Sequence, residues 1–169
     1  VLDEIYAKTR DLKNERGGPF HLGLYSYRDI IDWAPLTRAT PDGRRQGEFL
    51  AQGLTPTRNQ KNQEITSLMN SAAALDLTKY PANSVMTLSL PLNGTSLQTL
   101  AQVERVYAAS GLGMLQLNCV DKETLLDARL HPERHQDLMV RLYGYSARFV
   151  NLTAAMQEEF ISRNTFRNA

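Results

Sequence analysis

The sequence of 169 residues has little cysteine, no excess of either charge and no long apolar run. Its single cysteine, Cys119, excludes a disulfide framework within the chain. The net charge of +1 gives no reason to expect nucleic acid or a membrane surface as a partner. No stretch approaches the roughly 20 apolar residues that span a bilayer, and Val1–Ile5 do not resemble a signal peptide. We therefore expect a cytoplasmic protein.

The apolar pattern predicts alternating helices and strands. Proline and glycine gather between residues 35 and 63, which we interpret as a long ordered loop. Asp121 and Thr153 are expected to cap helices, and Thr95 and Gln98 to form a capping box. The predicted helices cover 2–16, 64–75, 95–110, 123–130 and a segment after Thr153; the predicted strands cover 21–27, 84–90 and 114–120. This order is typical of an α/β or α+β fold.

Gly144 lies between two tyrosines, Tyr143 and Tyr145. A glycine between bulky residues usually marks a backbone position with positive φ or close packing. Spacing alone therefore favours a structural glycine at this position.

The wider segment changes this interpretation. Residues 141–149 read Arg-Leu-Tyr-Gly-Tyr-Ser-Ala-Arg-Phe. This segment resembles the C-terminal signature of the glycyl radical enzymes, which has Arg, an aliphatic residue, a variable residue, Gly, Tyr, a small residue, two variable residues and Phe. Every fixed position matches, and Tyr143 occupies a variable position where a small residue is commoner.

Two further segments resemble the same family. Residues 40–51 contain Thr-Pro-Asp-Gly-Arg-Arg and then Gly-Glu-Phe-Leu-Ala, with Phe49 where the family has proline. Residues 116–138 resemble the family's approach to the radical loop. Together the three segments cover most of residues 22–165 in the expected order.

The resemblance implies an α/β fold made of the C-terminal strands and helices of a ten-stranded barrel, followed by a glycyl radical loop domain. Residues 21–27 and 84–90 would be the last barrel strands. The implied division places the barrel part in residues 1–120 and the glycyl radical domain in residues 121–169.

The resemblance also assigns the radical to Gly144. A radical at a backbone Cα is delocalised between the amide nitrogen and the carbonyl, and glycine has no Cβ to twist or crowd that planar centre. The resemblance also implies that oxygen, on meeting the radical, cleaves the chain at Gly144, so the site needs shielding. Residues expected to support the loop are Arg141, Tyr143, Tyr145, Ser146, Arg148 and Phe149. The two arginines would either anchor the loop by salt bridges or present it to an activating enzyme.

The expected partner is that activating enzyme, a radical S-adenosylmethionine protein with a [4Fe-4S] cluster, which removes a hydrogen atom from Gly144. No cofactor is expected on the chain itself. In this family the glycyl radical generates a thiyl radical on a cysteine far upstream. Cys119 does not match that position, and we expect it to be a small buried hydrophobic residue. The chain is thus predicted to carry the radical while lacking the upstream barrel region with the catalytic cysteine.

The implied reaction is the cleavage of a C–C or C–X bond in a small molecule, by a homodimer in anaerobic metabolism. Both the pyruvate formate-lyase branch, whose members are formate acetyltransferases, and the dehydratase and lyase branches fit; the run at 118–125 is more similar to the latter. A stand-alone radical subunit that repairs a damaged enzyme, and a non-enzymatic domain with the same fold, are the alternatives.

Two other patterns suggest ligands. His131 and His135 are spaced as a helical metal pair, but Pro132 interrupts them and no third ligand is evident, so we predict a surface turn and no metal. Residues 42–45, Asp-Gly-Arg-Arg, could bind phosphate. We favour an ordered turn whose arginines pair with carboxylates.

Overall fold

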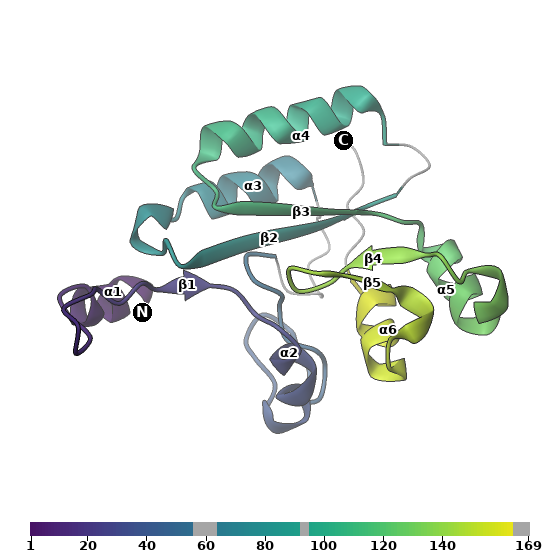
Figure 1. Ribbon diagram of the computed structural model, residues 1–169, viewed down its shortest axis with the longest axis horizontal. Helices are drawn as coiled ribbons and strands as arrows, with labels where there is room; N and C mark the ends of the chain where they lie inside the picture. The colour runs from purple at the N-terminus through teal and green to yellow at the C-terminus, as the bar shows by residue number, and fades with distance from the viewer. Residues whose placement is uncertain (56–63, 92–94, 164–169) are drawn as a thin grey trace.

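The computed structural model describes residues 1–55, 64–91 and 95–163 (Figure 1). A parallel sheet contains β1 (Gly23–Leu24), β2 (Asn83–Leu90) and β3 (Met114–Cys119) in that order. Helix α3 (Ile65–Ala73) precedes β2, and α4 (Leu97–Ser110) connects β2 to β3. Both helices lie over the same face of the sheet (Figure 1). The predicted α/β class is confirmed, because parallel neighbours need such helical crossovers.

The first hydrophobic core lies between this sheet and its two helices. Met86, Leu88 and Leu90 are completely buried and alternate along β2, as the period of a strand requires. They pack against Met69 of α3 and Val103 of α4. The neighbouring positions on β2 and β3 point away from the helices, and several of them are polar: Thr87, Gln116 and Asn118 are all buried.

A second core forms around the C-terminal part of the chain. It joins α5 (Lys122–Leu130), the hairpin of β4 (Met139–Arg141) and β5 (Ser146–Arg148), and α6 (Ala154–Ile161). The short helix α2 (Asp29–Asp32) also packs here through Ile30. The predicted division after residue 120 falls where the chain passes from β3 to α5. Single 3-10 turns span Ala34–Leu36, Leu77–Lys79, Pro132–Arg134 and Phe149–Asn151.

Three predictions of local structure were wrong. Helix α1 ends at Thr9 instead of residue 16, because the Asn14 side chain accepts hydrogen bonds from the backbone of Arg16 and Gly18, both at 2.9 Å, and this turn competes with a helix. The strand predicted over 21–27 pairs only at Gly23–Leu24. Beyond it, Ser26 Oγ accepts a hydrogen bond from the Gly53 amide at 2.9 Å, which draws the chain away from β2.

The capping box was also wrong, since Ser96 caps α4 by accepting from the Thr99 amide at 3.1 Å. Thr153 caps α6 as predicted, accepting from the Met156 amide at 3.3 Å. Asp121 occupies the N-cap position of α5.

The expected long loop is ordered over residues 35–55, whereas residues 56–63 lie outside the described part. No helix in the described ranges is long and apolar enough to cross a membrane.

Arg44 organises this loop from within. Its side chain is only 5% exposed, and its guanidinium donates to the backbone carbonyls of Thr37, Arg38, Arg45 and Glu48. Neither the phosphate site nor the predicted pairing with carboxylates holds for Arg44, because carbonyl oxygens occupy its donors. A buried guanidinium needs such partners, and a curved loop supplies several carbonyls at once.

We expect Arg44→Lys to lower the free energy of unfolding by roughly 2–4 kcal/mol, because an ammonium cannot reach all four carbonyls in the guanidinium's planar arrangement. Chemical denaturation measures the loss. Arg45→Lys is the matched control, since the Arg45 side chain is exposed, and it should leave stability nearly unchanged. Equal losses in the two variants would contradict a specific role for Arg44.

Candidate radical site

The hairpin of β4 and β5 places Gly144 at its tip. Met139 pairs with Arg148, Val140 with Ala147, and Arg141 with Ser146. Beyond the last pair, the Leu142 amide donates to the Tyr145 carbonyl at 2.9 Å, and the Gly144 amide donates to the Leu142 carbonyl at 2.9 Å. The reversal at Tyr143 and Gly144 is therefore tight and closed by backbone hydrogen bonds.

Gly144 has a backbone conformation that favours glycine. Its φ is +101°, in the region that residues with a side chain rarely adopt. A Cβ built on Gly144 would meet no atom within 4 Å, so space does not exclude a side chain here. Gly144 is exposed within this chain. Within this chain, glycine is therefore favoured at position 144 by its backbone conformation and not by lack of space. The described residues do not shield the Gly144 Cα.

Asn118 fastens the hairpin to the parallel sheet. Its Oδ1 accepts from the Arg141 amide at 2.8 Å, and its Nδ2 donates to the Arg141 carbonyl at 3.1 Å. The Asn118 side chain thereby pairs with the β4 backbone as a neighbouring strand would. Because Asn118 is 5% exposed, water competes little for either bond.

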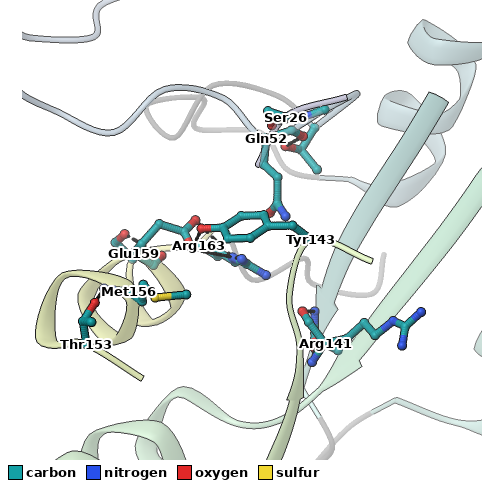
Figure 2. Close-up of polar contacts among 12 residues, drawn as sticks. Ser26, Gln52, Arg141, Tyr143, Thr153, Met156, Glu159 and Arg163 are labelled. Atoms are coloured by element: carbon teal, nitrogen blue, oxygen red, sulfur yellow. Dashed lines mark hydrogen bonds and ion pairs between the residues drawn. The ribbon is translucent and has the colours of Figure 1, made fainter. Parts of the chain in front are cut away.

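Tyr143 fastens the other side of the hairpin to α6 (Figure 2). Its hydroxyl lies 3.5 Å from Glu159 Oε2, a long hydrogen bond. Glu159 is completely buried and receives hydrogen bonds from the Arg163 guanidinium at 2.9, 3.1 and 3.3 Å. The guanidinium also lies 3.8 Å from the centre of the Phe160 ring. A buried ion pair needs such hydrogen bonds to offset the lost hydration of both charges. They reach the carboxylate from Nε and Nη2 of Arg163, whereas its Nη1 is buried without a hydrogen-bond partner among the described residues.

The remaining residues predicted to support the loop surround the hairpin in different ways. Arg141 donates to the Ser146 hydroxyl at 3.3 Å, and in the described part of the chain no carboxylate is within ion-pair distance of it. Arg148 lies 3.5 Å from Asp137, an exposed pair of little energetic value. Phe149 is completely buried in a T-shaped contact with the Phe160 ring, whereas Tyr145 is half exposed.

A pocket of about 390 Å³ opens beside the hairpin tip. Gly144 lies in its wall, together with Tyr143 and Tyr145. The other walls come from the start of β2 and β3 and from the segments around residues 25–27 and 52–53. Those lining residues are Tyr25, Ser26, Tyr27, Gln52, Gly53, Asn83, Val85, Thr87, Met114 and Gln116.

Cys119 and the two histidines lie away from this pocket. Cys119 is partly buried against the first core, on the face of β3 opposite Asn118, in agreement with its predicted packing role. His135 Nε2 lies 2.7 Å from Asp127 Oδ2, and His131 Nδ1 lies 3.7 Å from Glu133 Oε1. Among the described residues, no cluster of three or more His, Cys, Asp or Glu could hold a metal ion.

The sequence interpretation missed Asn118, Glu159 and Arg163. The sequence held a signal for Asn118, because polar residues alternate with apolar ones along β3, at Gln116 and Asn118. Both polar residues are buried, although among the described residues helices cover only the other face of the strand. For Glu159 and Arg163 the spacing of four residues indicated an ion pair on one helical face, but not its burial.

Comparison with known proteins identifies the family of this chain. The glycine radical family matches residues 50–150. The probable dehydratase YbiW of Escherichia coli K12 is 32% identical over 174 residues, which cover 96% of this chain and 21% of that protein. The trans-4-hydroxy-L-proline dehydratase of Clostridioides difficile is 28% identical over 166 residues, with the same two coverages.

Solved structures agree. The glycerol-bound B12-independent glycerol dehydratase of Clostridium butyricum superposes with a TM-score of 0.86 at 34% identity, over 95% of this chain and 21% of that one. A glycyl radical enzyme from Archaeoglobus fulgidus gives 0.84 at 31% identity, over 98% of this chain and 22% of that one. The chain belongs to the glycyl radical family. It spans about a fifth of the length of the curated relatives it matches.

We expect Asn118→Ala to loosen the hairpin, because both hydrogen bonds to Arg141 are lost, at a cost of about 1–3 kcal/mol. Hydrogen–deuterium exchange at the Arg141 amide should accelerate at least about tenfold. Asn70→Ala, at an exposed position of α3, is the control and should leave this amide unchanged. Unchanged exchange in Asn118→Ala would contradict the proposed attachment.

A pH dependence follows from Asp127. The hydrogen bond with His135 is the main cause that lowers the pKa of Asp127 from its usual 3.8. A lowered pKa stabilises the folded state above pH 3.8 and loses that effect as the pH falls through the folded-state value. The melting temperature of Asp127→Asn should thus be below that of the unmodified protein at pH 6, with the difference shrinking below pH 3.8. Asp11→Asn, at an exposed carboxylate, is the control; a pH-independent difference would contradict this account.

Proposed function

We propose that Gly144 is the radical-bearing residue of this chain. The observation that carries the proposal is its place at the hairpin tip with φ of +101°, in the wall of a pocket beside the parallel sheet. The family match over residues 50–150 contains this glycine and its signature. The lack of a side chain matters chemically, because a Cβ would twist or crowd the planar centre of a Cα radical.

The radical would be installed by an external activating enzyme of the radical S-adenosylmethionine type, which removes one hydrogen atom from the Gly144 Cα. Exposure of Gly144 within this chain supports such a step, since the donor carbon is accessible. The same exposure means that protection from oxygen would come from protein outside the described residues. We propose that the preceding barrel region supplies it.

The next step is hydrogen-atom transfer from a cysteine thiol to the Gly144 Cα, which restores the glycine and leaves a thiyl radical. Cys119 does not suit this role, because it packs toward the helices on the face of β3 opposite the hairpin. The catalytic cysteine would therefore lie in the barrel region that this chain does not contain. The polar face of the sheet, on which the described residues place the hairpin but no helix, supports this assignment, since parallel sheets are normally covered by helices on both faces. It also disfavours a stand-alone radical subunit.

For the complete enzyme we propose a dehydratase, in which the thiyl radical takes a hydrogen atom from a small hydroxylated substrate and a C–O bond breaks with release of water. Three of the four proteins named above support this branch, because their names are those of dehydratases. An anaerobic cytoplasmic setting and a homodimer remain part of the proposal.

The test uses oxygen as a chemical probe of the radical. After anaerobic activation and then exposure to air, mass spectrometry should find cleavage of the chain at residue 144. Gly144→Ala, treated identically, should stay intact, and Gly111→Ala, at the end of α4, should be cut like the unmodified protein. Cleavage elsewhere, or in Gly144→Ala, would refute the assignment.

A further inference from the structure

We propose that Tyr143 is a positioning residue for the radical at Gly144. Its anchored side chain fixes the peptide that precedes the glycine, so that hydrogen removal moves the peptide that follows it. This inference rests on the proposed function and deepens it, because it concerns the change of shape that the radical requires. Tyr143 occupies a variable position of the signature, so the role belongs to this chain and not to the signature itself.

The resting glycine and a glycyl radical need different backbone shapes. A Cα radical is delocalised only when the flanking amide and carbonyl groups lie in the plane of the Cα. A fully extended backbone meets this condition, because the carbonyl carbon then lies in the plane of the preceding peptide. At the φ of +101° that Gly144 adopts, the carbonyl carbon is nearly perpendicular to that plane. Hydrogen removal therefore favours rotation about the N–Cα bond of Gly144.

This rotation turns the peptide before Gly144 against the peptide after it, and either of them could move. The preceding peptide follows Tyr143, which is 7% exposed. The following peptide leads to Tyr145, which is 51% exposed within this chain. The contacts of the two tyrosines determine which peptide moves.

Tyr143 contacts two different parts of the chain. Figure 2 shows its side chain directed toward Glu159 and Arg163 at the end of α6. Its hydroxyl lies 3.5 Å from Glu159 Oε2, and the Arg163 guanidinium lies 6.0 Å from the centre of its ring. The Tyr27 ring lies 6.5 Å from the Tyr143 ring between centres, in a T-shaped contact. Turning the preceding peptide would disturb all of these contacts and the burial of the ring.

The peptide after Gly144 is held less firmly. Among the described residues, neither its carbonyl, from Gly144, nor its amide, from Tyr145, forms a backbone hydrogen bond. The next group along the chain, the Tyr145 carbonyl, accepts from the Leu142 amide at 2.9 Å. One such bond contributes less than the burial and contacts of a large ring, so the Tyr145 side moves. Its carbonyl then separates from the Leu142 amide.

Fixing the preceding peptide also fixes the position of the reacting carbon. The Gly144 Cα belongs to the planar unit of that peptide, so it stays in place while its remaining substituents rotate. A thiol that gives a hydrogen atom to this carbon would thus find it at the same place in each reaction cycle. Tyr143 acts through this peptide and needs no contact with the substrate.

The experiment compares amide exchange in the full-length enzyme before and after anaerobic activation, by mass spectrometry at residue resolution. The Leu142 amide should exchange at least about tenfold faster in the activated enzyme, because it loses its acceptor. The Arg141 amide, which donates to Asn118, is the internal reference and should keep its rate. Gly144→Ala, carried through the same activation, should show no acceleration at Leu142.

Electron paramagnetic resonance on activated variants tests Tyr143 itself. Tyr143→Ala should broaden the lines of the Gly144 doublet, because the preceding peptide no longer keeps one orientation. Tyr143→Phe keeps the ring contacts with Tyr27 and Arg163 and should restore narrower lines. Tyr145→Ala is the matched control on the other side of the glycine and should leave the line width unchanged. A variant that only failed to fold would give no doublet, and Leu142 exchange in the unmodified enzyme would then decide.

Equal Leu142 exchange before and after activation, or equal line widths in Tyr143→Ala and Tyr145→Ala, would overturn the inference. Oxygen cleavage at Gly144 in the same preparation reports on the radical alone. An enzyme that is cut at Gly144 while Leu142 exchange stays unchanged would therefore refute the positioning role and leave the radical assignment standing.

Discussion

The hydrogen-bonded pairing of Asn118 with the backbone of Arg141 connects the two parts of the molecule. On one side is the parallel sheet with its own core, and on the other is the hairpin that packs on α5 and α6. Among the described residues, the hairpin pairs with no strand of the sheet. This side chain substitutes for one, with contacts of 2.8 and 3.1 Å to the amide and carbonyl of a single residue. The position of Gly144 relative to β2 and β3, and hence the shape of the pocket, depends on it.

The buried pair of Glu159 and Arg163 has a complementary role. Such pairs add little to stability compared with apolar side chains of the same size, because two charges lose their hydration. What this pair supplies is position: three hydrogen bonds fix the carboxylate, and the carboxylate lies next to the hydroxyl of Tyr143. The residue before Gly144 is therefore held from α6, while the start of the hairpin is held from β3. Restraint on both sides suits the proposed role of Gly144, in which its Cα would meet a reaction partner at a defined place.

Much of the fold could be predicted from the sequence, where local pattern and burial agree. The alternation of Met86, Leu88 and Leu90 predicted β2 and its buried face, and the Thr153 cap marked the start of α6. The errors arose where side chains act on a distant backbone or compete with a helix. Asn14 ends α1 by a local turn, and Ser26 diverts the chain after β1 by binding Gly53, which is 27 residues away. Gly144 was identifiable as a signature position, but its supports Asn118 and Glu159 act through contacts over 23 and 16 residues, which no local pattern reveals.

The central claim is that Gly144 stores the radical, and electron paramagnetic resonance on the anaerobically activated protein tests it most directly. The account predicts a doublet produced by the one hydrogen left on the Gly144 Cα. That doublet should collapse to a single line when the protein is made with α-deuterated glycine, and it should be absent from Gly144→Ala. A doublet that persists in Gly144→Ala, or a spectrum that deuterated glycine leaves unchanged, would contradict the account.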